Sequence, residues 1–202
     1  MVDTEENIRI TDEELFAQFI AGQSAGFDAL VDRYYKQVYR FLVRFTGRPH
    51  LAEDLIQDVF MKVYRSANTF DPERKFRPWL YSIAANRARD ALRSVGRSEK
   101  QILVHRTKAG EETSLEELLP GAPSPPDREI IARETTEKVQ RALMDMPDQL
   151  REIVTLAYYN QMPYKDIAGA LGIPLGTVKS RLHKAVLTFG EIWKRYEPDS
   201  KR

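Results

Sequence analysis

The stretch YKDIAGALGIPLGTVKSRLHKAVLTF, residues 164–189, decides how the C-terminal part of the chain folds. Its first half predicts a short helix that ends at Gly172, because glycine readily adopts the left-handed conformation with which many helices end. Pro174 suits the start of a helix but not its interior. A second helix is therefore predicted, with apolar residues every three or four positions. These residues are Val178, Leu182, Val186 and Phe189.

The opposite face of this second helix is polar and basic. It carries Thr177, Lys179, Ser180, Arg181, His183 and Lys184. Two short helices, a glycine turn and a basic second helix describe a helix-turn-helix, whose second helix enters the major groove of DNA. The alternative is an ordinary helical hairpin with a solvated basic face.

The bulk composition favours a globular protein without thiol chemistry. The chain has 202 residues, which suits one large domain or two small ones. It has no apolar run near the roughly 20 residues that a membrane helix needs. The absence of cysteine excludes disulfides, thiolate zinc sites and cysteine nucleophiles, and fits a reducing cytosol.

The net charge of +1 hides an uneven distribution. Residues 1–32 hold eight acidic side chains and one basic side chain, which gives −7. Residues 71–106 hold nine basic and four acidic side chains, which gives +5. A concentrated basic segment is the expected footprint of a phosphate-contacting surface.

Four helices are predicted in the N-terminal part. Thr11 and Glu14 form a capping box that starts the first. A long amphipathic helix runs from Ser24 to Gly47, and its aromatic stripe is interpreted as helix-bundle core and not as a ligand box. Pro49 and Pro78 begin the third and fourth helices.

The outward face of the third helix holds two carboxylates at helical spacing. It consists of Asp54, Gln57, Asp58 and Met61, among other polar residues. The residues alone favour a solvated face over an interface. Paired carboxylates can perform acid–base chemistry, but no histidine, serine or metal-ligand set is placed to join them. We expect no catalytic residues, no metal site and no cofactor.

Aromatic and basic residues alternate before the fourth helix. The loop ANTFDPERKFR, residues 67–77, contains Phe70, Arg74, Lys75 and Phe76. Exposed rings stack on unpaired bases while cations hold phosphates, so the loop suits single-stranded nucleic acid. The alternative is that both phenylalanines plug the bundle. Further residues of the fourth helix extend the same surface: Trp79, Asn86, Arg89 and Arg93.

The sequence therefore predicts an all-α protein of two small helical domains joined by a flexible linker. The first domain spans residues 1–94, and an acidic, proline-rich linker spans 95–133. The second domain spans 134–195, and a polar tail follows at 196–202.

The order of motifs resembles the extracytoplasmic-function sigma factors, the compact branch of the sigma-70 family. The segments that carry the resemblance are DEELFAQFIAGQSAGFDALVDRYY, LAEDLIQDVFMKVYR, FRPWLYSIAANRARDALR, MPDQLREIVTLAYY and YKDIAGALGIPLGTVKSRLHKA. One such motif is moderate evidence, whereas five in order are strong evidence. The resemblance implies a non-catalytic subunit that joins the RNA polymerase core and directs it to promoters.

The resemblance also implies a role for each surface. The helix with Asp54, Gln57 and Asp58 would dock on the coiled coil of the β′ clamp. The loop from Phe70 to Phe76, with Trp79 and Asn86, would capture a base flipped from the −10 element. The basic helix would read the −35 element as duplex. A flipped base held in a pocket offsets part of the unstacking cost of a few kcal/mol.

The sequence departs from the family at three positions of that basic helix. The family often carries arginine where this chain has Lys179 and Lys184, and lysine lacks the bidentate fork that recognises guanine. His183 stands where an apolar or aromatic residue is common, so its role is open.

The resemblance implies further partners, and two other functions remain open. The implied partners are the polymerase β′ clamp and β flap, promoter DNA and an anti-sigma factor that wedges between the domains over the Asp54 face. The protein would be cytoplasmic, monomeric when free and without membrane contact of its own. One alternative is a dimeric DNA-binding regulator with a ligand-sensing first domain. The other is an adaptor that binds polymerase without reading promoters.

Overall fold

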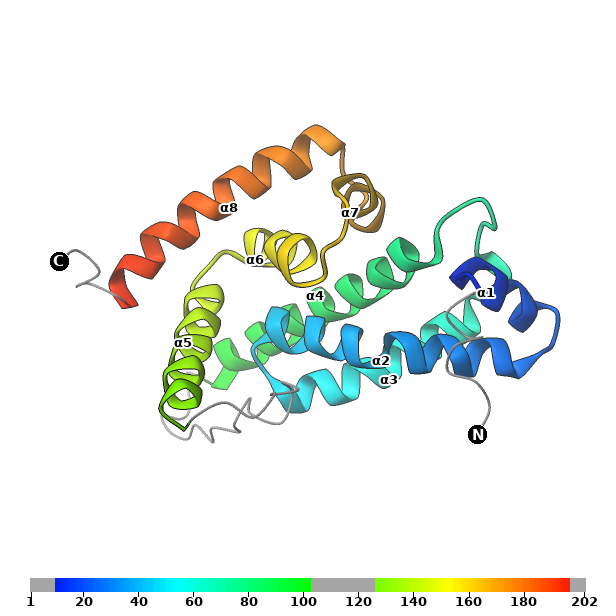
Figure 1. Cartoon of the computed structure of the whole chain (residues 1–202), viewed down its shortest axis with the longest axis horizontal. Coiled ribbons are helices and arrows are strands. Elements are labelled where there is room, and N and C mark those ends of the chain that lie inside the picture. Colours follow the sequence, from blue (N-terminus) through cyan, green and yellow to red (C-terminus); the bar gives the residue numbers. More distant parts are fainter. Residues whose placement is uncertain (1–9, 103–125, 197–202) are drawn as a thin grey trace.

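The computed structural model describes residues 10–102 and 126–196, and all the regular structure in these ranges is helical (Figure 1). The predicted all-α class with two small helical domains is confirmed. Helices α1 to α4 form the N-terminal domain, and the helices from α5 to α8 form the C-terminal domain.

Helix α1 (Asp12–Ile20) begins with the predicted capping box. The Glu14 amide donates to Thr11 Oγ1 at 3.2 Å, and the Thr11 amide donates to Glu14 Oε2 at 2.8 Å. These hydrogen bonds from Thr11 hold the pKa of the Glu14 carboxyl below its usual value. Local chemistry alone therefore fixes where the first helix starts.

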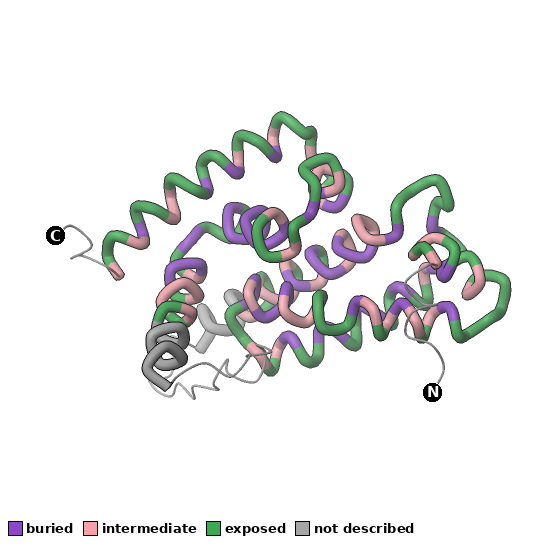
Figure 2. The backbone as a smooth tube through the Cα atoms, viewed as in Figure 1, coloured by how far each residue is buried: buried purple, intermediate pink, exposed green. Residues whose placement is uncertain are grey.

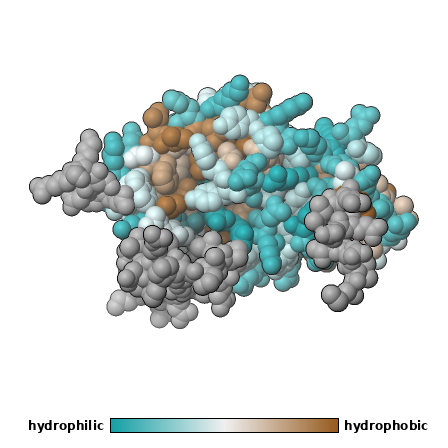
Figure 3. Space-filling view, in the orientation of Figure 1, coloured by the Kyte–Doolittle hydropathy of each residue, from teal (hydrophilic) through white to brown (hydrophobic). Residues whose placement is uncertain are grey.

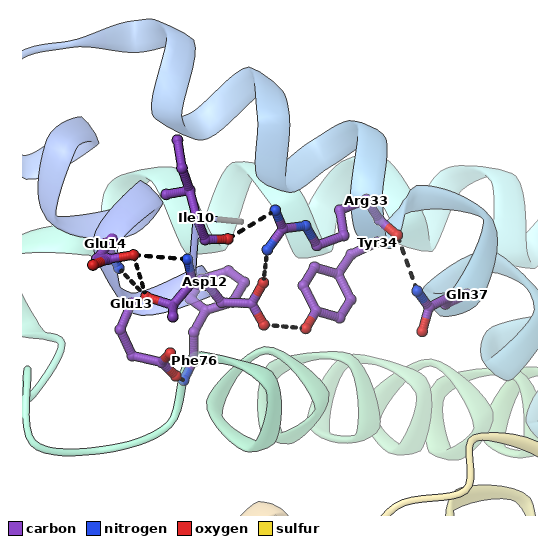
Figure 4. Close-up of polar contacts among 9 residues, drawn as sticks. Ile10, Asp12, Glu13, Glu14, Arg33, Tyr34, Gln37 and Phe76 are labelled. Carbon is purple, nitrogen blue, oxygen red and sulfur yellow. Dashed lines mark hydrogen bonds and ion pairs between the residues drawn. The ribbon is translucent and has the colours of Figure 1, made fainter. Parts of the chain in front are cut away.

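Two carboxylates of α1 attach it to the rest of the domain (Figure 4). Asp12 accepts a hydrogen bond from Arg33 Nη1 at 2.5 Å and another from the Tyr34 hydroxyl, both from α2 (Ser24–Thr46). Glu13 Oε1 accepts a hydrogen bond from the Phe76 amide at 2.8 Å. The first turn of α1 is thus attached both to α2 and to Phe76, the first residue of α4 (Phe76–Ile102).

Helix α2 ends at Gly47, which has φ 70° as its predicted helix-ending role requires. Pro49 then opens α3 (Pro49–Arg65), also as predicted. Helix α4, by contrast, starts at Phe76 and not at Pro78. A proline is tolerated in the first turn because the amides there have no partner within the helix.

The helices extend into the stretch that the sequence suggested as linker. Helix α4 continues past residue 94 to Ile102, and α5 (Pro126–Met144) begins before residue 133. The centre of the predicted linker, 103–125, and residues 197–202 of the predicted tail lie outside the described residues.

The core of the N-terminal domain is built from rings and branched aliphatic side chains. Its largest fully buried members are Tyr81, Phe16, Phe41, Phe45, Phe76, Leu30, Leu42, Ile56 and Leu80. The aromatic stripe of α2 is therefore core, as predicted. Burial of apolar area of this kind is the main contribution to stability.

The C-terminal domain follows the predicted helix-turn-helix order. Helix α6 (Asp148–Val154) continues into η4 (Thr155–Tyr159), a turn of π-helix. Helix α7 (Tyr164–Leu171) ends at Gly172 with φ 65°, and α8 (Leu175–Tyr196) follows.

The buried stripe of α8 shares Val178 and Leu182 with the predicted apolar stripe, whereas Phe189 is only partly buried. The fully or nearly fully buried residues are Val178, Leu182, Ala185 and Ile192. Val186 is half exposed, so its prediction as a core residue is wrong. After Leu182, the residues three and four positions on are both near the same face, and the packing of α8 selects the smaller Ala185.

The two domains lie against each other (Figure 1). Helix α4 packs on α7, while α2 contacts η4, α5 and α6. Buried backbone runs along the facing sides of these helices, and the outer side of α8 is mostly exposed (Figure 2).

Candidate nucleic-acid interface

Polar and basic side chains recur every three or four residues along α4. Asn86 and Arg93 are exposed and Arg89 is partly exposed. Arg89 Nη2 donates to Asn86 Oδ1 at 2.6 Å, and Arg93 Nη1 lies 3.4 Å from Asp90 Oδ1. This spacing brings the three predicted side chains onto one side of the helix.

The loop before α4 presents cations to its surroundings. Arg74 and Lys75 are exposed. Arg74 Nε lies 3.3 Å from Asp71 Oδ2, an exposed pair that contributes little to stability. Lys75 reaches across to the C-terminal domain, where Nζ lies 3.2 Å from Asp166 Oδ2.

Phe70 and Phe76 are buried, so the expectation that they are exposed platforms for base stacking is wrong. Both rings pack on Phe16, with centroids 5.0 Å apart in each case. The exposed fraction is 8% for Phe70 and 0% for Phe76. The two rings turn toward the apolar core of the bundle despite their basic neighbours in the loop, because a buried ring contributes more to the stability of the fold than a solvated one. The Trp79 ring lies over Phe70, with 4.9 Å between the ring centroids, and remains partly exposed.

The basic residues of α8 face outward. Lys179, Ser180, His183 and Lys184 are exposed, while Thr177 and Arg181 are partly exposed. The turn between α7 and α8 is fixed by a hydrogen bond from the Ile173 amide to the Ala168 carbonyl at 3.1 Å. The structure therefore brings all six predicted residues onto the accessible side of the second helix of the motif.

Apolar side chains border this basic helix. In the space-filling view they gather in the upper part of the molecule, which α8 crosses (Figure 3). The exposed members on α8 are Leu175, Val186 and Leu187. Such a patch is typical of a surface that meets another protein.

The predicted face of α3 lies at the surface. Asp54, Gln57, Asp58 and Met61 are all exposed. Tyr64, one turn beyond, is 55% exposed, and Tyr35 of α2 is stacked on Phe60 with centroids 6.4 Å apart. The exposed tyrosines extend the acidic face, which the polar pattern of α3 alone did not reveal.

A buried carboxylate lies where the two domains meet. Glu152 of α6 is 3% exposed, and its Oε1 is 3.4 Å from Arg89 Nε. Burial raises the pKa of the Glu152 carboxyl to about 7, although Arg89 and Arg181 act in the opposite direction. The Glu152 carboxylate is therefore paired with Arg89 of α4 and also interacts electrostatically with Arg181 of α8.

Asn160 makes two further contacts between the domains. Arg77 Nη2 donates to the Asn160 carbonyl at 2.5 Å, and Asn160 Nδ2 donates to the Tyr81 hydroxyl at 2.6 Å. Burial raises the pKa of Tyr81 to about 12. Arg44 of α2 lies over the Tyr159 ring, 4.4 Å from its centroid.

Sequence analysis did not single out Glu152, Asn160 or Asp166. Glu152 carries the one available signal, since it is an acid beside the apolar residues Ile153 and Val154. Its partner Arg89 lies in the other domain. Nothing in the spacing of either segment predicts that contact.

The described part of the chain contains no group of three or more histidine, cysteine, aspartate or glutamate side chains that could hold a metal ion. Among the same residues, no helix combines the length and the apolar character needed to cross a bilayer.

Two family models match the chain, in the order of the two domains. Sigma-70 region 2 matches residues 30–98, and Sigma-70, region 4 matches residues 136–188. The ECF RNA polymerase sigma factor SigW of Bacillus subtilis is 31% identical over 81% of this chain and 86% of its own length. The RNA polymerase sigma-H factor of Pseudomonas aeruginosa is 32% identical over 86% of this chain and 89% of its own length.

Solved structures share the fold. CnrH, in complex with the cytosolic domain of CnrY, superposes with a TM-score of 0.68 at 23% identity and covers 94% of this chain and 99% of its own. The sigma factor RpoE of Bartonella quintana, in complex with the anti-sigma factor NepR, superposes with a TM-score of 0.65 at 21% identity. It covers 83% of this chain and 96% of its own.

Proposed function

This chain belongs to the extracytoplasmic-function sigma factors of the sigma-70 family, and we propose that it uses three separate surfaces to bind polymerase, open promoter DNA and read duplex DNA. As a sigma factor it is a non-catalytic specificity subunit of RNA polymerase. The single observation that carries the assignment of surfaces is that each domain presents its own basic helical face, one on α4 and one on α8.

The acidic face of α3 is the proposed contact for the β′ clamp. Asp54, Gln57, Asp58 and Met61 are exposed together on one helix. Carboxylates around an exposed methionine and Tyr64 combine electrostatic steering with an apolar centre, which suits a protein partner more than an anionic nucleic acid.

The face of α4 is the proposed reader of the −10 element. Asn86 offers amide groups to a base edge, Trp79 offers part of a ring face, and Arg74, Lys75, Arg89 and Arg93 offer cations to phosphates. Phe70 and Phe76 act from beneath as packing that shapes this surface.

The basic face of α8 is the proposed reader of the −35 element in duplex form. A helix of this kind fits the major groove, where base pairs present distinct hydrogen-bonding patterns. Lys179 and Lys184 are expected to contact phosphates or single acceptors on guanine, since lysine cannot form the bidentate pair of arginine. Thr177, Ser180, Arg181 and His183 complete the contact surface.

Two protein partners are proposed for the remaining surfaces. The exposed apolar residues of α8 are suited to the polymerase β flap, and an anti-sigma factor is proposed as inhibitor. Relatives of known structure are described in complex with CnrY and with the anti-sigma factor NepR. Work with RNA polymerase would place the protein in the cytoplasm.

The test is run-off transcription with purified core RNA polymerase and fragmented DNA from the source organism. We expect transcripts with defined start sites, and those sites define both promoter elements. The proposal would be contradicted if no transcripts formed and gel filtration showed no complex between this protein and core polymerase.

A further inference from the structure

Met61 of α3 is the most exposed methionine in the described part of the chain. The sequence has five methionines and no cysteine, so methionine carries all of its sulfur chemistry. Met61 is 52% exposed, whereas Met146 and Met162 are 3% and 2% exposed in the core. Met144 is partly buried, with its sulfur close against Gly47. A dissolved oxidant therefore reaches the Met61 sulfur more easily than that of any other described methionine.

Met61 lies at the centre of the proposed polymerase-binding face of α3. Asp58 precedes it by one turn and Tyr64 follows it by one turn, and both are exposed. The Tyr64 ring packs on Phe19 and Phe27, with centroids 5.0 and 5.4 Å apart. The Met61 thioether and this ring form an apolar centre within an acidic surface. An apolar centre with a polar rim is the usual composition of a protein–protein interface.

Oxidation changes the polarity of a methionine side chain. Hydrogen peroxide transfers one oxygen atom to the thioether sulfur: an S–O bond forms, the O–O bond of the peroxide breaks, and the peroxide is reduced to water while the sulfur loses two electrons. The product, methionine sulfoxide, is polar where the thioether was apolar. Sulfoxide reductases reverse the step, with a separate enzyme for each sulfoxide epimer.

The location of Met61 makes this change matter for binding and not for folding. In the free protein the sulfoxide oxygen would remain in water, because the side chain lies on the outer face of α3. In a complex the oxygen would be buried against the partner, where a polar atom without a hydrogen-bond donor is costly. The exposed carboxylates of Asp54 and Asp58 are acceptors and do not supply that donor.

We propose that Met61 is an oxidation-sensitive contact, and that its conversion to methionine sulfoxide by a peroxide weakens the binding of α3 to core RNA polymerase. The proposal rests on the proposed function of the acidic face of α3. It gives a chain without cysteine a reversible response to oxidants, through a thioether that the core does not protect.

The first measurement is peptide mapping by mass spectrometry. The full-length protein is treated with hydrogen peroxide under non-denaturing conditions, and catalase removes the peroxide before any partner is added. We expect Met61 to be converted to the sulfoxide while Met146 and Met162 remain thioethers. Oxidation of the two core methionines before Met61 would contradict the proposal.

Affinity for core polymerase is then measured by fluorescence anisotropy of the dye-labelled protein, before and after treatment. We expect binding to weaken about ten-fold, the equivalent of about 1.4 kcal/mol. The melting temperature should stay the same, because the added oxygen is solvated in the free protein. Incubation with both kinds of sulfoxide reductase should restore the affinity. Unchanged affinity of a protein whose Met61 is oxidised would overturn the proposal.

Two substitutions separate Met61 from the other methionines, and each protein is compared with its own untreated form. Met61→Leu cannot be oxidised at this position, so its affinity should be the same before and after peroxide. Met144→Leu keeps Met61 and should lose affinity about ten-fold on treatment, as wild type does. If Met61→Leu lost affinity to the same extent, the effect would arise at another methionine and the proposal would be wrong.

The untreated wild type tests the proposed function separately. If it binds core polymerase and supports run-off transcription, a negative oxidation result contradicts the further inference alone. If it does not bind core polymerase, the proposed role of α3 fails first, and the inference about Met61 fails with it.

Discussion

A single side chain, Glu152, interacts electrostatically with arginines of both proposed DNA-reading helices, α4 and α8. It is buried beside Arg89, and its pKa is raised to about 7 because the loss of solvation outweighs the two nearby arginines. A raised pKa means that the folded state is more stable with the Glu152 carboxyl protonated than with it ionised. Ionisation of this buried carboxyl lowers the free energy of unfolding.

The stability of the chain should therefore depend on pH. Below the ordinary pKa of 4.5, the Glu152 carboxyl is protonated in both the folded and unfolded states. Between that value and about 7 the folded state keeps a proton that the unfolded state has lost, so the free energy of unfolding falls as pH rises. The full penalty, on the order of 3 kcal/mol, is present above pH 7.

Glu152→Gln should remove this dependence, because glutamine is neutral at every pH. We expect the variant to be more stable than wild type by roughly 2–3 kcal/mol at pH 8 and nearly equal to it at pH 5. Urea unfolding at the two pH values measures the difference. Glu137→Gln, on an exposed part of α5, serves as control. A gain of the same size at both pH values would show that the effect comes from packing.

Lys184→Ala tests whether the exposed face of α8 reads promoters. The loss of one phosphate contact should lower promoter-specific transcription several-fold and make binding less dependent on salt, with unchanged melting temperature and core binding. Run-off assays over a series of salt concentrations measure both effects. Unchanged transcription would favour a protein that binds polymerase without reading the promoter.

Some residues were predictable from sequence and others were not, for a physical reason. Gly47, Gly172 and the Thr11 cap follow from backbone chemistry within a few residues. Phe70 and Phe76 do not, because a ring between basic residues can turn toward solvent or toward the core. Rings from other helices, such as Phe16 of α1, decide it.

At the scale of elements, the N-terminus of α4 depends on a different helix. The Phe76 amide donates to Glu13 of α1, so α1 caps the helix that carries the proposed −10 reader. The sequence predicts both helices but not this cap, since the two residues are 63 positions apart. The prediction that α4 starts at Pro78 is two residues late, because the bond between Glu13 and the Phe76 amide is not visible in the local sequence.

Glu13→Ala should leave that amide without its carboxylate partner. We expect a loss of about 1 kcal/mol in stability, typical of a removed helix cap. Opening of the −10 region should weaken while core binding is kept, because α3 is not involved. Permanganate footprinting of the promoter and urea unfolding provide the two measurements. Equal loss of opening and core binding would indicate general unfolding of the domain.

The exposed acidic face of α3 provides a second test at this scale. Asp54→Ala with Asp58→Ala should weaken binding to core polymerase at least ten-fold, the equivalent of about 1.4 kcal/mol. Stability should change little because both side chains are exposed. Affinity for core is measured by fluorescence anisotropy, and duplex DNA binding by the same protein should be unchanged. Asp28→Ala, an exposed acid of α2, is the matched control.

For the whole molecule, the predicted organisation as two helical domains is confirmed, while the contact between them could not be predicted. Each domain has its own apolar pattern, and those patterns predict helices locally. The interdomain contacts depend on pairs such as Lys75 with Asp166, which are 91 positions apart. No local pattern links such residues.

The close fit of Met144 against Gly47 has a consequence for hybrid proteins. A Cβ atom at residue 47 would lie 2.5 Å from the Met144 sulfur, so even the turn between α2 and α3 is shaped to its neighbour across the domain boundary. In a hybrid whose first half carries a side chain at this position, the flexible end of Met144 would have to move aside. A substitution at residue 144 would be the natural compensation, because the two positions meet across the domain boundary.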